Sequence, residues 1–279
     1  MTRRRGPKLS ASRLAKWLGR RVEQALTARK DTYVFLSPPY TDKQTVLNRI
    51  TKARTTFRIR SKSDLSIAKQ IFQSEDYRLE RLARHPDIRA RYDALVKAGK
   101  TPLIVDCGGN IGLSSLYFSE HFPKARIVTV EPGDDNFATL SENCRGRNII
   151  PVQAAIAAEA SVGRVVDIGR GTAALQVVPD PEGDLVFTTV PELITQHGGE
   201  GAVPFLLKVD IEGFEHDLFS RPAPWLDDFY VVVMELHDWM MPGEARSGNF
   251  LRAIAPLNRD FVHINENIFS IANRAPSVD

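Results

Sequence analysis

One acid, one amide and three glycines lie between Asp106 and Gly112, and this combination suits the binding of a small ligand. The segment follows an apolar run at residues 103–105 and precedes a helical pattern, so it lies where a parallel strand ends and a helix begins. Ligands of open α/β sheets bind at such strand ends. Gly108 and Gly112 let the backbone turn tightly and approach the ligand, while Asp106 and Asn110 offer polar groups.

The spacing of these glycines argues against a dinucleotide as the ligand. A dinucleotide loop has the pattern G-x-G-x-x-G, and neither Gly108 nor Gly109 is followed by a glycine two positions later. An acid beside the loop instead suits a cationic cofactor such as S-adenosylmethionine, which carries a sulfonium and an ammonium group. The predicted cofactor loop residues are Asp106, Gly108, Asn110 and Gly112.

Residues after the next two apolar runs extend the predicted cofactor site. Glu131 ends the run at residues 127–130, where a carboxylate can accept hydrogen bonds from both ribose hydroxyls. Asn136 either caps the helix that follows or contacts the ribose. Gln153 and Ala154 should end the third strand, and small residues there would leave room for adenine.

The candidate catalytic residues follow two later runs, at residues 205–209 and 230–236. Transfer of a methyl group needs alignment of the reacting atoms, and an acceptor group that carries a proton must lose it. His237 titrates near neutral pH and is the predicted general base, with Asp210 orienting it or binding the acceptor and Glu212 completing the set.

The same side chains offer ligands for a divalent metal. Asp210, Glu212 and His237 supply oxygen and nitrogen atoms, although methyl transfer does not require a metal. Lys208 lies on the strand that ends at Asp210 and either pairs with one of these acids or reaches outward.

Five short apolar runs alternate with helical patterns, which predicts parallel βαβ units covered on both faces. Two further runs, at residues 261–264 and 268–272, predict a closing antiparallel hairpin. The expected fold class is therefore α/β and Rossmann-like, with a mostly parallel seven-stranded sheet. Residues 163–189 are long for a plain crossover and either add strands or form a loop over the active site.

The N-terminal part has a different pattern, and we predict three regions. Residues 1–56 form a basic tail and linker, residues 57–99 a largely helical extension covering the active site, and residues 100–279 the cofactor-binding domain. Residues 1–30 hold ten basic side chains and one acid, so the remaining chain carries a net negative charge, which disfavours nucleic acid as its partner. A basic amphipathic helix at residues 14–26 can rest on an anionic membrane surface or a partner, or pack on its own domain.

Composition limits the remaining classes of function. The two cysteines, Cys107 and Cys144, do not form a disulfide framework or a metal cluster. The sequence has no apolar run of the roughly 18 residues that a membrane span needs. No apolar run follows the basic start, so we expect a cytoplasmic protein without a secretory signal. Oligomeric state cannot be predicted from these features.

Three segments resemble the FkbM family of methyltransferases. They are D-C-G-G-N-I-G at residues 106–112, V-E-P at residues 130–132 and, most specifically, L-K-V-D-I-E-G-F-E at residues 207–215. The resemblance runs from about residue 57 to the C-terminus, although the family usually has alanine where Gly109 stands. It implies the class I methyltransferase fold, S-adenosylmethionine as cofactor and O-methylation of a hydroxyl, often on a sugar, glycolipid, polysaccharide or polyketide.

Two other functions are weighed against this one. Residues 37–40, with the sequence S-P-P-Y, resemble a motif of amino-methylating DNA methyltransferases, which predicts base N-methylation and salt-sensitive nucleic-acid binding. The fourth-strand position that such a motif would need is already filled by residues 208–210, and a Pro-Pro linker explains the motif equally. The other alternative is a non-catalytic module that has kept the fold.

Overall fold

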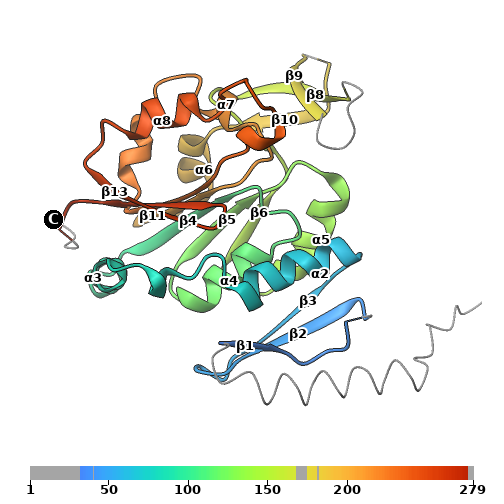
Figure 1. Cartoon of the computed structure of the whole chain (residues 1–279), viewed down its shortest axis with the longest axis vertical. Helices are drawn as coiled ribbons and strands as arrows, with labels where there is room; N and C mark the ends of the chain where they lie inside the picture. Colours follow the sequence, from blue (N-terminus) through green and yellow to red (C-terminus); the bar gives the residue numbers. More distant parts are fainter. Residues whose placement is uncertain (1–31, 40, 168–174, 181, 276–279) are drawn as a thin grey trace, which may run out of the picture.

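The computed structural model describes residues 32–39, 41–167, 175–180 and 182–275. Within them, a seven-stranded sheet with the order β13-β14-β12-β11-β4-β5-β6 forms the centre of the molecule (Figure 1). The five strands from β12 to β6 are parallel, and β14 pairs antiparallel with both β12 and β13. The predicted Rossmann-like fold with its C-terminal hairpin is thereby confirmed. The strands are β4 (Thr101–Cys107), β5 (Arg126–Val130), β6 (Ile149–Val152), β11 (Ala202–Val209), β12 (Val231–Glu235), β13 (Arg259–Ile264) and β14 (Asn267–Ala272).

Two layers of helices bury the two faces of this sheet. On one face, alternate strand residues such as Ile104 and Leu206 join a core with α3 (His85–Lys97), α4 (Leu113–His121) and α5 (Asp134–Cys144). On the other, Val105 and Leu207 pack with α6 (Val190–His197), α7 (Glu215–Leu218) and α8 (Gly248–Ile254). Because both faces are covered, the strands are continuously apolar, as parallel strands must be.

A three-stranded antiparallel sheet lies partly within residues 1–56, the predicted tail and linker. It consists of β1 (Tyr33–Phe35), β2 (Lys43–Asn48) and β3 (Arg54–Arg58). The prediction of a linker up to residue 56 was wrong here, because Tyr33 and Phe57 are buried against Phe72, with ring centroids 5.3 and 5.4 Å away. The S-P-P-Y motif begins in the connection from β1 to β2, and the helix predicted at residues 14–26 lies outside the described residues.

Helices and helical turns connect this small sheet to the central one. They are α2 (Lys62–Lys69), the π-helical turn η1 (Gln70–Ser74), the 3-10 turn η2 (Leu79–Arg81) and α3. The Ser61 hydroxyl accepts a hydrogen bond from the Asp64 amide and so caps α2.

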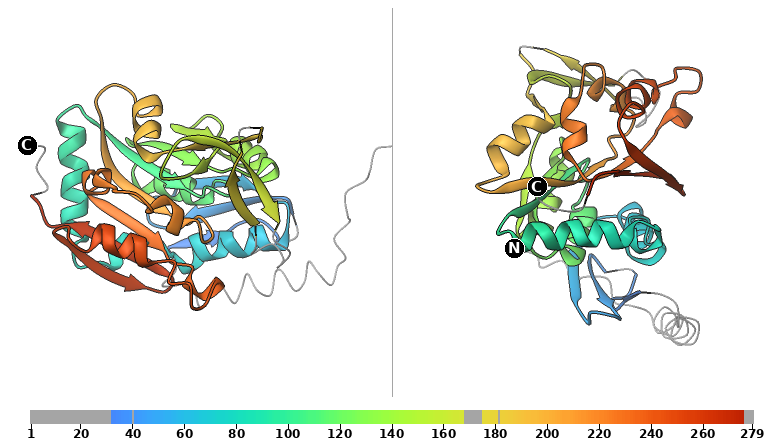
Figure 2. Two further views of the ribbon diagram at one scale, coloured as in Figure 1. Left: turned by 90° about the horizontal axis from the view of Figure 1, so that it is seen from above. Right: turned by 90° about the vertical axis from the view of Figure 1, so that its left-hand side faces the viewer.

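The long connection at residues 163–189 adds strands, and this resolves the alternative that the sequence left open. β7 (Ala155–Ile156), β8 (Ser161–Asp167), β9 (Leu175–Pro179) and β10 (Leu185–Thr188) form a separate sheet with the order β7-β10-β8-β9. Figure 2 shows this sheet and the β1–β3 sheet at opposite ends of the molecule.

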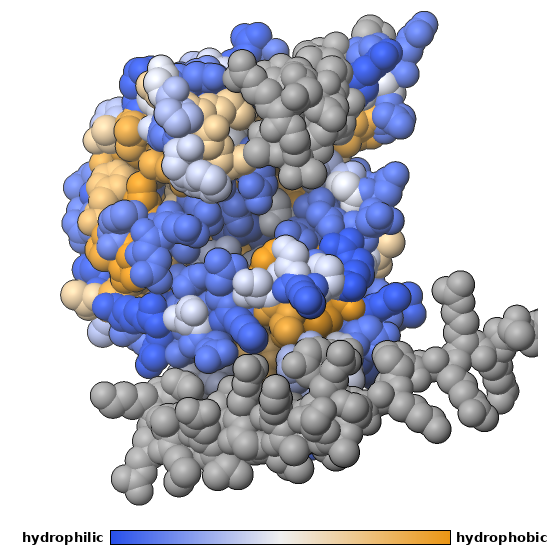
Figure 3. Space-filling model, turned by 45° about the vertical axis from the view of Figure 1, so that its right-hand side comes forward, coloured by the Kyte–Doolittle hydropathy of each residue, from blue (hydrophilic) through white to orange (hydrophobic). Residues whose placement is uncertain are grey.

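The surface is mainly hydrophilic on the side drawn in Figure 3, where blue areas separate the hydrophobic ones. The exposed large apolar side chains are scattered over several elements, among them Ile50, Val186 and Leu251. In the described part of the chain, none of the helices has the length and apolar character needed to cross a bilayer.

Helix α6 begins with a capping box that should contribute measurably to stability. The Thr189 hydroxyl accepts from the Glu192 amide at 3.2 Å, and the Glu192 carboxylate accepts from the Thr189 amide at 3.1 Å. We expect Thr189→Ala to lower the free energy of unfolding by about 1 kcal/mol, measured by urea denaturation. The control is Thr195→Ala on the same helix, whose hydroxyl caps no amide. An equal loss in both variants would contradict a specific role for the cap.

Candidate active site

A cleft of about 260 Å³ lies at the carboxyl ends of β4, β11 and β12. Strand order reverses between β4 and β11, which is where ligands bind in open α/β sheets. Residues 108–111 of the predicted cofactor loop line one side, and the N-terminal extension supplies Ile67, Ile71 and Tyr77. The charged side chains that line the cleft are Asp76, Lys208, Asp210, Glu212, Glu235, His237 and Glu266.

Asp106 lies beneath the cofactor loop, where it is fully buried. Its Oδ2 accepts hydrogen bonds from the hydroxyls of Ser114 and Ser115, both at 2.6 Å, and its Oδ1 lies 3.3 Å from the Lys208 ammonium. These contacts fasten the start of α4 to the end of β4. Asp106 therefore shapes the cofactor loop from below. The sequence predicts instead that it contacts the cofactor directly.

Lys208 is a buried cation between two acids. Its Nζ lies 3.3 Å from Asp106 and from Asp210, and it donates to the Gly108 carbonyl oxygen at 2.7 Å. Burial alone would lower the pKa of Lys208, but the charges of Asp210 and Asp106 outweigh it and raise the pKa well above its usual value. The ammonium therefore stays charged and holds the ends of β4 and β11 together.

The loop glycines are required by close packing. Gly108 has φ +84°, and a Cβ there would overlap the backbone oxygen of Asp210 on the neighbouring strand. Gly112 has φ +89°, and a Cβ there would lie 3.0 Å from the Cys144 sulfur on α5. Gly108 lines the cleft, whereas Gly112 lets α4 approach α5.

Glu131 is almost fully buried at the end of β5, with three protein donors around its carboxylate. Its Oε2 accepts from the Asn110 amide at 3.0 Å, and its Oε1 from the Gly133 amide at 3.1 Å and the Asn136 Nδ2 at 3.0 Å. Burial raises the pKa of Glu131, although these hydrogen bonds act in the opposite direction. Asn136 thus supports Glu131 from α5, and its side chain does not cap that helix.

The two residues predicted at the adenine end differ in their surroundings. The Gln153 Nε2 donates to Asp134 at 2.6 Å on the surface, next to the start of α5. Ala154 is buried among the core residues packed beneath β6, including Val128 and Val130. Neither residue lines the cleft, so contact of Ala154 with a cofactor finds no support in its position.

His237 is buried, with its two ring nitrogens in different surroundings. Its Nδ1 lies 3.0 Å from a carboxylate oxygen of Glu215, which only accepts hydrogen bonds, so Nδ1 carries the proton. Its Nε2 points toward Asp210 and Glu235, at 3.7 and 3.6 Å. Glu215 is itself fixed because it accepts from the Ile211 amide at 3.1 Å.

The acids around His237 set its protonation. Burial would lower the pKa of His237, but the hydrogen bond that its Nδ1 donates to Glu215 and the charges of Glu215, Asp210 and Glu235 raise it to about 9. Burial and the charge of Asp210 raise the pKa of Glu235 to about 7, against the effect of His237. The cluster therefore contains two groups that exchange protons between neutral and mildly basic pH.

The third member of the possible metal-binding group, beside Asp210 and His237, is Glu235 and not the predicted Glu212. Oxygen and nitrogen atoms of Asp210, Glu235 and His237 lie within 4.8 Å of one another, close enough to hold one divalent cation. Glu212 lines the cleft but lies outside this group. The signal in the sequence was the spacing, since Glu235 and His237 lie two residues apart at a strand end and so face the same side.

The chain is similar to known methyltransferases. A model of the methyltransferase FkbM domain matches residues 106–266. The hexuronic acid methyltransferase AglP of Haloferax volcanii is 25% identical over 195 residues, which cover 65% of this chain and 79% of that protein. "Methyltransferase 1" of Beauveria bassiana is 41% identical over 51 residues, which cover 18% of this chain and 20% of that one.

Solved structures show weaker likeness. An O-methyltransferase from Bacillus cereus, crystallised with S-adenosylhomocysteine, has 10% identity and a TM-score of 0.37, with coverage of 77% of this chain and 93% of that chain. The family match extends from the acid beneath the cofactor loop to the closing hairpin and spans more than half of the sequence. The chain therefore belongs to the FkbM family and is a methyltransferase.

Proposed function

We propose that the protein is an S-adenosylmethionine-dependent O-methyltransferase that acts on a hydroxyl of a sugar or another small molecule. The observation that carries this proposal is His237, held by buried Glu215 with its Nε2 directed into a cleft beside the cofactor loop. A general base in this position suits a hydroxyl acceptor, whose proton must leave. The relative named as a hexuronic acid methyltransferase supports a sugar acceptor.

The residues of the cleft fit a cationic cofactor. Five acids and two bases line it, so the cleft has an excess of negative charge that attracts a sulfonium and an ammonium group. Glu131 does not itself line the cleft, but its Oε2 holds the amide of Asn110, which does. Its Oε1 already accepts two hydrogen bonds and its Oε2 one, which leaves a lone pair on Oε2 for a ribose hydroxyl. The proposed cofactor contacts are therefore Glu131 and the loop residues Gly108 and Asn110.

When bound, S-adenosylmethionine supplies an electrophilic methyl group on its sulfonium. His237 Nε2 would take the proton of the acceptor hydroxyl, whose oxygen would receive that methyl group. The imidazolium that results is stabilised by Glu215, Asp210 and Glu235. Asp210 and Glu235 also offer acceptor atoms for other hydroxyls of a sugar.

A divalent cation is not needed in this scheme. The Lys208 ammonium already lies 3.3 Å from Asp210, and a dication bound to the same carboxylate would be repelled by it. We therefore assign His237 Nε2 to proton transfer and not to metal binding.

Calorimetric titration of the purified protein tests the cofactor. We expect micromolar binding of S-adenosylmethionine and S-adenosylhomocysteine and no binding of NAD. Incubation with labelled S-adenosylmethionine and uronic acid glycosides, followed by mass spectrometry, then tests the acceptor class. Absence of adenosyl binding to the folded protein, or equal binding of NAD, would overturn the proposal.

The base predicts a particular pH dependence. Because only neutral imidazole accepts a proton, kcat/KM should rise with pH and level off above about 9, the pKa of His237. Glu215→Gln removes a hydrogen bond and a charge that raise this pKa, so the midpoint should move to lower pH while the plateau falls. Asp217→Asn, on the exposed side of the same helix, serves as the control. An unmoved midpoint in Glu215→Gln would assign the titration to another group.

A further inference from the structure

Arg60 leaves the end of β3 and is held rigidly by an acid of the next helix. Its backbone amide and Nε donate to Asp64 Oδ2 at 2.7 and 3.1 Å, and its Nη2 donates to Asp64 Oδ1 at 3.2 Å. Asp64 is itself buried. Because a carboxylate engages this guanidinium along one edge, its remaining donors have a fixed direction.

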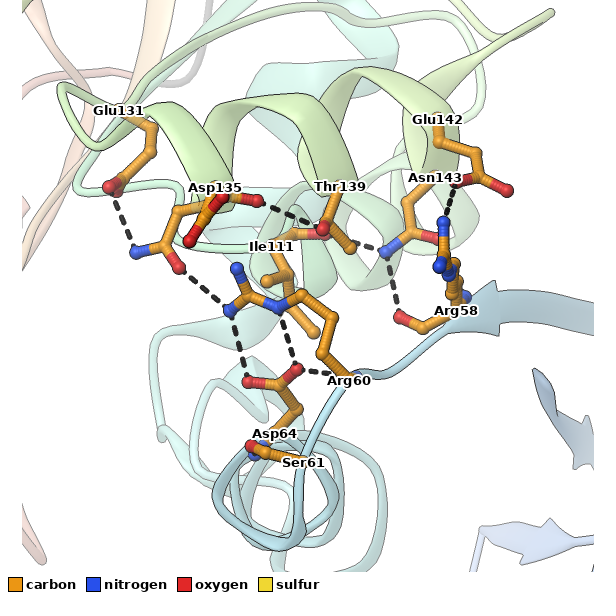
Figure 4. Close-up of polar contacts among 11 residues, drawn as sticks. Arg58, Arg60, Ser61, Asp64, Ile111, Glu131, Asp135, Thr139, Glu142 and Asn143 are labelled. Carbon is orange, nitrogen blue, oxygen red and sulfur yellow. Dashed lines mark hydrogen bonds and ion pairs between the residues drawn. The ribbon is translucent and has the colours of Figure 1, made fainter. Parts of the chain in front are cut away.

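Two hydrogen bonds connect the Arg60 guanidinium to Glu131 of the proposed cofactor site. Beyond its contacts with Asp64, which Figure 4 draws, Arg60 Nη2 also donates to Asn136 Oδ1 at 2.7 Å. Asn136 Nδ2 in turn donates to Glu131 Oε1 at 3.0 Å. A guanidinium can only donate, and a side-chain amide has one accepting and one donating end. Arg60 therefore determines which way the Asn136 amide faces and keeps its NH₂ group on Glu131.

A second contact joins the same segment to the cofactor loop. The Arg58 backbone donates to Asn143 Oδ1 at 2.6 Å and accepts from its Nδ2 at 3.1 Å. The same Nδ2 donates to the carbonyl oxygen of Ile111, which lines the cleft, at 2.8 Å. The N-terminal extension thus contacts α5 at Asn136 and Asn143. Asn136 is hydrogen-bonded to Glu131, and Asn143 to Ile111.

We propose that Arg60 is a positioning residue for the cofactor, acting through Asn136 on Glu131. Asn136 and the Gly133 amide occupy Oε1, which fixes the plane of the carboxylate and leaves Oε2 with one acceptor position beyond the Asn110 amide. Arg60 lies outside residues 106–266, so a segment that precedes the family domain completes its cofactor site. This inference rests on the proposed use of S-adenosylmethionine.

The test is the affinity for S-adenosylhomocysteine, measured by calorimetry on the full chain. We expect Arg60→Ala to weaken binding roughly tenfold, the scale of one hydrogen bond to a charged group. The matched control is Arg58→Ala, two residues earlier, which removes only a surface ion pair with Glu142 and leaves the backbone contacts in place. When the concentration of S-adenosylmethionine is varied, Arg60→Ala should raise the KM for the cofactor. The kcat reached at saturation should stay unchanged.

A double-mutant cycle separates this role from general stabilisation. Because Arg60 acts through Asn136, Arg60→Ala combined with Asn136→Ala should bind no more weakly than Asn136→Ala alone. If Arg60→Ala does not fold, Arg60→Lys keeps the charge beside Asp64 but loses the planar fork, and it should weaken binding as well.

Each outcome has a distinct meaning. Equal affinities of the Arg60 and Arg58 variants, or additive losses in the cycle, would overturn the role of Arg60 and leave the proposed function intact if the wild type binds. Failure of the folded wild type to bind the adenosyl ligand would overturn the proposed function and this inference together.

Discussion

Replacing His237 by alanine is expected to lower kcat by a factor of 10² or more and to leave the affinity for S-adenosylhomocysteine unchanged. The variant removes the group whose Nε2 faces the cleft, and a positioned general base contributes about 10²- to 10⁴-fold to the rate. The cofactor loop and Glu131 make no hydrogen bond or ion pair to His237 among the described residues. The measurements are single-turnover methyl transfer and calorimetric titration.

Two controls make this result specific. His263→Ala removes an exposed histidine on the closing hairpin and should not change the rate. Turnover by the wild type after treatment with EDTA should equal turnover with added Mg²⁺, because His237 is assigned to proton transfer and not to a cation. A rate unchanged in His237→Ala would exclude it as the base, and a loss of activity with EDTA would make Nε2 a metal ligand.

Replacing Glu131 by alanine should weaken binding of the adenosyl ligands about a hundredfold. A hydrogen bond to a charged group contributes about 1.5–3 kcal/mol, and the variant also leaves the partly buried amide of Asn110 without its acceptor. Glu131→Gln keeps one accepting oxygen and should show a smaller loss. Titration with S-adenosylhomocysteine gives both values.

The control for this prediction is Glu142→Ala, which removes an exposed carboxylate from the nearby helix α5. It should bind the adenosyl ligands like the wild type. An affinity of Glu131→Ala equal to that of the control would show that the ribose is recognised elsewhere.

The central sheet could be predicted from the sequence because its signals are local. Each parallel strand is a short apolar run, and a helical pattern follows each run. The β1–β3 sheet could not be predicted in this way. Its strands are short, and several of their buried side chains, such as Gln44 and Thr55, are polar. Tyr33 is buried by Phe72, far along the chain. No pattern within the segment shows that partner.

The candidate site could be predicted only in part, for the same reason. The strand ends that carry Glu131, Asp210 and His237 follow from the topology. The roles of Glu215 and Arg60 do not, since Glu215 meets His237 across 22 residues and Arg60 meets Asn136 across 76. The sequence also does not show in which direction an acidic side chain beside a glycine-rich loop points. The side chain of Asp106 points into the core.

Gly109 illustrates how a departure from the family pattern can be local. A Cβ at this position would overlap the hydroxyl of Thr129 and lie 2.8 Å from a methyl carbon of Leu140. Glycine here is therefore matched to its neighbours on β5 and α5.

The acid-lined cleft has a consequence for the second half of the catalytic cycle. In the proposed reaction, the cofactor enters with a positive sulfur and leaves with a neutral one. The acids that line the cleft attract the first form more strongly than the second, because the transfer moves the positive charge from the cofactor to the His237 imidazolium. The cleft thereby favours exchange of the spent cofactor for a fresh one, so that resistance to product inhibition follows from the same charges that recruit the methyl donor.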